Sequence, residues 1–112
     1  MNFEILQTTK YTQINSKVEK LDASNATELK TELTSLNKSG VNTIVFDLSK
    51  TRYCDSSGLS AILMANRMCR DTNGRFILTG MQENVIKMIK IAQLDKVLSI
   101  YNSVDEAEKS LY

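Results

Sequence analysis

Hydrophobic residues recur along this chain with two different periods, and the alternation of the two predicts an α/β domain. Apolar and polar positions alternate over 3–8 and 11–18, which predicts two half-exposed edge strands joined by a Thr-Lys turn. A nearly continuous apolar run at 41–48 predicts a strand covered on both faces. Shorter apolar runs at 76–79 and 97–100 predict two further strands.

Apolar positions three and four residues apart predict helices between and after these strands. The first helix carries one apolar stripe, made of Ala26, Leu29, Leu33 and Leu36. We expect Asp22 or Ser24 to cap its start and Gly40 to follow its end. A second helix is predicted over about 57–71 and is closed by the Asn-Gly pair at 73–74.

Two shorter helices complete the pattern. One is predicted over 82–92 with four residues turned inward, namely Val85, Ile86, Ile89 and Ala92. The other begins at a capping box at 103–106 and has one apolar face, made of Val104, Ala107 and Leu111. Strands that alternate with helices favour a mixed, mostly parallel sheet of about four to five strands with helices packed on it. We expect one domain over residues 1–112.

Charge and composition narrow the classes of function. The chain has 14 basic and 13 acidic residues, and this near balance argues against nucleic-acid binding. No run of about eighteen apolar residues is present, and the first five residues do not resemble a signal peptide, so we expect a cytoplasmic protein without direct membrane insertion. The two cysteines, Cys54 and Cys69, fit no metal-ligand spacing and are predicted to be free buried thiols.

The most informative stretch is the passage from the buried strand at 44–48 into the second helix, through Asp55, Ser56 and Ser57. The first N–H groups of a helix are unpaired and favour anionic groups. A serine at this place is therefore either a helix cap or a residue that carries a phosphate, and both interpretations stay open. A nucleophilic serine is excluded, since the chain has no histidine and no G-x-S-x-G motif. Phosphate-cradling nucleotide motifs are also missing, so we expect no enzyme activity, no cofactor and no metal.

The strand at 45–49 followed by the string Cys-Asp-Ser-Ser-Gly-Leu at 54–59 resembles the STAS domain of bacterial anti-sigma-factor antagonists. The resemblance covers nearly the whole chain and implies a single STAS-like domain. It implies that Ser57 is the phosphorylation site, and it places the two family aspartates at Asp22 and Asp55. Two positions depart from the family pattern: Glu19 replaces a frequent glycine, and Cys54 replaces an aliphatic residue.

The resemblance also implies a mechanism. With Ser57 unmodified, the protein binds an anti-sigma factor with serine-kinase activity and so frees a sigma factor for transcription. Phosphorylation of Ser57 by that kinase ends the contact, and a PPM-type serine phosphatase restores it. Eight residues are expected to face the partner, namely Asp22, Asp55, Ser56, Ser57, Gly58, Leu59, Leu63 and Met64. A monomer or weak dimer is expected.

Apolar residues occupy most of the helical wheel between Leu59 and Arg70, although a helix packed on a sheet needs only about a third of its circumference to be apolar. Either the helix is deeply buried under its neighbours, or a patch around Leu63, Met64 and Met68 is exposed and covered by a partner. Two further functions stay open. The domain could be a STAS subunit of a membrane transport assembly that binds its partner constitutively, or a STAS domain that binds a nucleotide or another small molecule.

Overall fold

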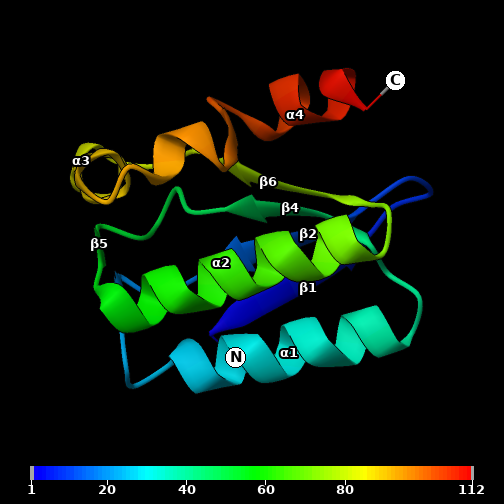
Figure 1. Cartoon of the computed structure of the whole chain (residues 1–112), viewed down its shortest axis with the longest axis horizontal. Coiled ribbons are helices and arrows are strands. Elements are labelled where there is room, and N and C mark those ends of the chain that lie inside the picture. Colours follow the sequence, from blue (N-terminus) through cyan, green and yellow to red (C-terminus); the bar gives the residue numbers. More distant parts are fainter. Residues whose placement is uncertain (1, 112) are drawn as a thin grey trace.

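A five-stranded mixed sheet forms the centre of the computed structural model, which describes residues 2–111 (Figure 1). Met1 and Tyr112, the two ends of the predicted domain, lie outside the described residues. The strands, in their spatial order, are β1 (Phe3–Gln7), β2 (Thr12–Ser16), β4 (Thr43–Asp47), β6 (Arg75–Thr79) and β7 (Ser99–Tyr101). β1 and β2 pair antiparallel, whereas every other pairing in this sheet is parallel. The predicted α/β class and mostly parallel sheet are therefore confirmed.

The helices cover the two faces of the sheet unequally. The α-helices of the described chain are α1 (Ala26–Lys38), α2 (Ser56–Asp71), α3 (Glu83–Ile91) and α4 (Val104–Ser110). Figure 1 shows α1 and α2 side by side on one face and α4 on the other, with α3 beyond one end of the sheet. No helix within residues 2–111 is both long and apolar enough to cross a membrane.

The main core fills the space between the sheet and the layer formed by α1 and α2. The ring of Phe46, on the central strand β4, lies 6.3 Å from that of Phe3 and 6.2 Å from that of Phe76. Tilted aromatic pairs at such distances add to the stability that burial provides. The predicted stripe of α1 faces this core, and all its members are buried: Ala26, Leu29, Leu33 and Leu36. This prediction is confirmed.

A second, smaller core lies between the sheet and α4. Val45 and Ile77 point to this face and pack with Ala107, and all three are fully buried. Because Ile44 and Phe46 belong to the main core, strand β4 is buried on both faces, as its continuous apolar run predicts. Ser103 caps α4 by accepting the Glu106 N–H at 3.2 Å, as its capping box predicts.

Strand β2 is not an edge strand, and this expectation is wrong. It lies between β1 and β4, and its Ile14 pairs with Ile5 on one side and Phe46 on the other. The alternating pattern comes from unequal cover of its two faces. Ile14 is fully buried in the main core, whereas Gln13 and Asn15 stay half-exposed because α4 lies over β4, β6 and β7.

Two expectations near the C-terminus are also wrong. Helix α3 ends at Ile91, so Ala92 is an exposed C-cap residue and does not point inward. The next residue, Gln93, has a left-handed φ of 60° and leads into a 3-10 turn, η1 (Leu94–Lys96). Val97 is the C-cap residue of that turn and is 51% exposed, so the final strand begins only at Ser99.

Candidate functional site

Two short strands outside the main sheet build the site. β3 (Lys20–Leu21) and β5 (Tyr53–Cys54) pair in parallel, with Leu21 opposite Cys54. Each strand runs directly into one of the predicted aspartates, so Asp22 and Asp55 leave the same edge of this small sheet. The Asp55 N–H donates to the Leu21 carbonyl at 3.1 Å and joins the two segments.

Glu19, where the family pattern often has glycine, fits this small sheet without disturbing it. Its carbonyl accepts hydrogen bonds from the N–H groups of Arg52, at 2.7 Å, and Tyr53, at 3.1 Å. Its exposed side chain lies 3.9 Å from the Arg52 guanidinium, a contact of little energetic weight at the surface. The departure from the family pattern therefore falls on a side chain that points to solvent.

Asp55, not a serine, caps α2. Its Oδ1 accepts the Gly58 N–H at 3.0 Å, and its carbonyl accepts the Leu59 N–H at 2.9 Å. Within residues 2–111, neither the Ser56 hydroxyl nor the Ser57 hydroxyl takes part in a hydrogen bond with another residue. Ser56 is exposed and Ser57 is half-buried. Of the two roles that the sequence left open for a serine here, the helix cap thus belongs to Asp55 instead, and the Ser57 hydroxyl makes no bond within the described chain.

Gly58 is required by the packing of α2 on β3. It is buried, and a Cβ added to it would lie 2.5 Å from the Leu21 carbonyl oxygen and 2.7 Å from the Cys54 sulfur. Distances this short exclude a side chain. The backbone that approaches Gly58 closely is therefore that of Leu21 in the same chain, and this contact sets the position at which α2 begins.

Asp22 does not cap α1 and neither does Ser24, contrary to expectation. The N-cap is Asn25, whose side chain makes no capping bond. The Asp22 Oδ1 is already used, because it accepts from the Ser24 hydroxyl at 2.6 Å and the Ser24 N–H at 3.0 Å. These bonds, with a smaller contribution from the charge of Lys20, hold the pKa of Asp22 below its usual range. Asp22 therefore carries its negative charge at neutral pH.

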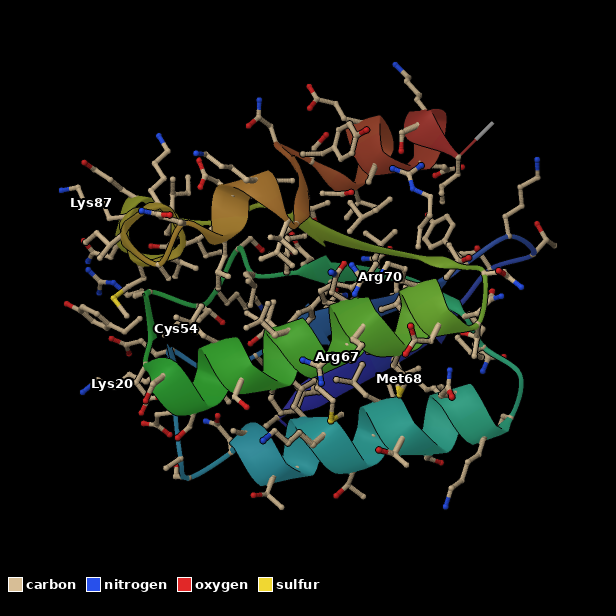
Figure 2. The ribbon with its side chains drawn as sticks, in the orientation of Figure 1. Lys20, Cys54, Arg67, Met68, Arg70 and Lys87 are labelled. Carbon is tan, nitrogen blue, oxygen red and sulfur yellow. The ribbon has the colours of Figure 1, made fainter. Side chains whose placement is uncertain are left out.

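Two grooves flank the start of α2. The aspartate groove, about 370 Å³, is lined by Lys20, Leu21, Asp22, Tyr53, Cys54 and Asp55. Figure 2 shows its Lys20 and Cys54 at the same end of the molecule. The serine groove, about 340 Å³, lies between the starts of α1 and α2 and is lined by Ala23, Ala26, Thr27, Lys30, Ser56, Ser57 and Ser60. The predicted site residues are therefore brought to one end of the molecule but divided between two neighbouring grooves.

The exposure of the apolar face of α2 lies between the two alternatives that the helical wheel left open, namely deep burial under its neighbours and an exposed patch that a partner covers. Leu59 is 9% exposed, whereas Leu63, Met64 and Met68 are half-buried. Met68 lies between α2 and α1 (Figure 2). Leu59, Leu63 and Met64 line a third groove of about 470 Å³, here called the apolar groove, together with Ala92, Leu94 and polar residues that include Lys30 and Arg67. These side chains form one wall of a groove, and their part in partner binding stays a prediction.

The free energies of unfolding of two single variants test which residue caps α2. Asp55→Ala removes the bond to the Gly58 N–H and should lower the free energy of unfolding by about 1 kcal/mol. Ser57→Ala removes a hydroxyl that makes no bond within the described chain and should change it by less than about 0.5 kcal/mol. Urea unfolding of the two variants measures both values. Equal losses would contradict the assignment of the cap to Asp55.

The two cysteines should react slowly in the folded protein. Both are free and buried, as predicted. Burial raises the pKa of Cys54 to about 12, with help from the charge of Asp55, and raises the pKa of Cys69 to about 11. At pH 8, thiol-disulfide reagents should label both cysteines at least about 100-fold more slowly in the native chain than in urea, because the thiolate is the reactive form. Fast labelling of Cys54 without denaturant would show that the junction beside Gly58 opens readily.

The family model of the STAS domain matches residues 8–107. BtrV of Bordetella bronchiseptica, named as a candidate anti-sigma factor antagonist, is 25% identical over 87 residues, which cover 78% of this chain and 75% of BtrV. The crystal structure of a candidate anti-sigma factor antagonist from Thermotoga maritima has a TM-score of 0.86 at 26% identity and covers 97% of this chain and 93% of the other.

A second similar structure is that of the Bacillus cell fate determinant SpoIIAA in its phosphorylated form. It has a TM-score of 0.76 at 20% identity, and the match covers 98% of this chain and 99% of SpoIIAA. At this identity the likeness concerns the fold alone. The family match extends from the β1–β2 turn into α4 and so includes both aspartates and the start of α2. The chain belongs to the STAS domain family.

Proposed function

We propose that this chain is an anti-sigma factor antagonist, a regulatory binding protein rather than an enzyme, and that Ser57 is its switch. In the unphosphorylated state it binds an anti-sigma factor with serine-kinase activity in the cytoplasm, and a sigma factor is released. Phosphorylation of Ser57 ends the contact, and a PPM-type phosphatase reverses it by hydrolysis to inorganic phosphate. The observation that carries this proposal is the free Ser57 hydroxyl at the start of α2, whose cap is supplied by Asp55.

The local geometry favours a phosphate that leaves the fold intact. In the kinase step, the Ser57 Oγ forms a bond to the γ-phosphorus of ATP, ADP leaves, and the hydroxyl proton passes to the kinase. The product carries about −1.5 to −2 charges at neutral pH. The N-terminal N–H groups of α2 stabilise such a charge. That SpoIIAA has the same fold in its phosphorylated form supports a switch without unfolding.

The negative charge of a phosphate on Ser57 also opposes the docking of a partner protein. Asp22 and Asp55 lie in the neighbouring groove, so a partner that covers this end of the molecule already meets two carboxylates. A phosphate beside them must lose its water or be repelled when the surfaces close. Since 1.4 kcal/mol changes an affinity tenfold, even a modest penalty is enough for release.

The switch is tested by binding of Ser57→Ala and Ser57→Asp to proteins captured from an extract of the host cell. Ser57→Ala should capture an ATPase of the histidine-kinase-like class, and Ser57→Asp should bind the same protein at least about tenfold more weakly. Ser35→Asp adds the same charge at an exposed position of α1 and should bind as the wild type does. When the wild-type chain is incubated with ATP and the captured protein, Ser57 should gain a phosphate.

Equal binding by Ser57→Ala and Ser57→Asp, with no phosphate gained from ATP, would contradict the switch and favour constitutive docking in a transport assembly. A thermal shift produced by a nucleotide alone would favour a ligand-binding STAS domain instead. Both alternatives share this fold, so the fold does not separate them. The three functions are therefore separated by whether Ser57 gains a phosphate and whether a charge at Ser57 weakens partner binding.

The apolar groove gives a second, independent test of docking. Met64→Asp places a charge on a half-buried wall residue of the apolar groove, so partner binding should fall at least about tenfold while the melting temperature changes little. Ile91→Asp, at an apolar position that is 80% exposed on α3, is the matched control and should leave binding unchanged. A large loss of thermal stability in Met64→Asp would instead show that Met64 belongs to the core.

A further inference from the structure

We propose that Lys30 is the counter-ion of phosphorylated Ser57 and that it moves from Ser60 to the phosphate when the switch is set. This role rests on the phosphorylation of Ser57 proposed above. Lys30 lies on α1, and its Nζ donates a hydrogen bond to the Ser60 Oγ of α2 at 3.3 Å. This bond crosses the serine groove, in which Ser57 also lies.

The position of Ser60 brings the lysine amine close to Ser57. Residues three apart on a helix are neighbours on the same face, and Ser57 and Ser60 line one groove with Lys30. Lysine has a long flexible stem with a compact charge, and a phosphate adds acceptor oxygens beyond the serine Oγ. The change of partner from Ser60 to the phosphate therefore needs only a rotation of the Lys30 side chain, with α1 and α2 in place.

Lys30 is a cation for which the described part of the chain supplies no carboxylate partner. Among the residues that the structure describes, its Nζ forms no ion pair. The positions one turn before and after it on α1 are occupied by Ala26, Thr27, Leu33 and Thr34. None of these can neutralise it. The Ser60 hydroxyl is a neutral acceptor, so a phosphate in its place adds the attraction between opposite charges to the hydrogen bond.

The charges around Ser57 are arranged so that a phosphate turns toward Lys30. Asp22 and Asp55 line the aspartate groove and repel it, whereas Lys30 is the one charged residue among positions 2–111 that lines the serine groove. The phosphate would then occupy the space between the starts of α1 and α2. Lys30 thus acts as a positioning residue of the switch, because it sets on which side of α2 the new charge comes to lie.

A double-mutant cycle on the whole chain tests this pairing without any partner protein. Phosphoserine is inserted at position 57 during translation, and urea unfolding is measured with Lys30 and with Lys30→Gln, in the phosphorylated and unmodified forms. In the unmodified form Lys30→Gln removes only the bond to Ser60, whereas in the phosphorylated form it removes the ion pair proposed to replace that bond, so the difference between the two losses measures the change of partner. Lys30→Gln should lower the folding equilibrium constant about 3- to 5-fold more in the phosphorylated form than in the unmodified form, which is the effect expected of a partly exposed ion pair. This additional loss, here called the excess, should shrink at 1 M salt.

Lys38→Gln removes the same charge at an exposed position near the other end of α1 and should show no such excess. A Ser57→Asp version of the cycle, with a single negative charge, should give an excess of the same sign but smaller. Equal losses in both forms with Lys30→Gln, or an equal excess with Lys38→Gln, would overturn the role of Lys30. Loss of partner binding is measured separately, so a failure of the switch and a failure of this pairing are distinguishable.

Discussion

The contact between Gly58 and the Leu21 carbonyl is the constraint on which the rest of the site depends. The first turn of α2 can lie on β3 only because position 58 carries no side chain. The Asp55 N–H donates to the same carbonyl, so the end of β5, the start of α2 and the end of β3 are tied together at one atom. This tie brings the Asp22 and Asp55 segments together and sets the position of Ser57 beside α1.

In the proposed switch, stability and regulation belong to different residues of this junction. Asp55 satisfies the backbone of α2, and Leu21 with Cys54 fills the space beneath it. Ser57 contributes nothing to the cap, so a modification of its hydroxyl does not remove a bond that the fold needs. A binding surface that changes its charge while its backbone stays fixed is a suitable basis for a switch, because the two states then differ in docking rather than in folding.

The extent to which the sequence predicts this structure follows from the length of each pattern. The continuous apolar run of β4 and the leucine stripe of α1 are long enough to be unambiguous, and both are confirmed. β3 and β5 have two residues each, which is too few for any period, so no pattern in the sequence predicts them. Their pairing is what assembles the aspartate groove. The position of Lys30 opposite Ser60 is likewise a tertiary contact between two helices that no local pattern encodes.

The proposed switch is tested most directly by the affinity of the protein captured with Ser57→Ala for two purified forms of the chain, one with serine and one with phosphoserine at position 57. Isothermal titration under identical salt conditions gives both dissociation constants. The phosphorylated form should bind at least about tenfold more weakly, and the circular dichroism spectra of the two forms should coincide. Equal dissociation constants would contradict the proposed switch, and so would a weaker affinity accompanied by loss of the folded spectrum.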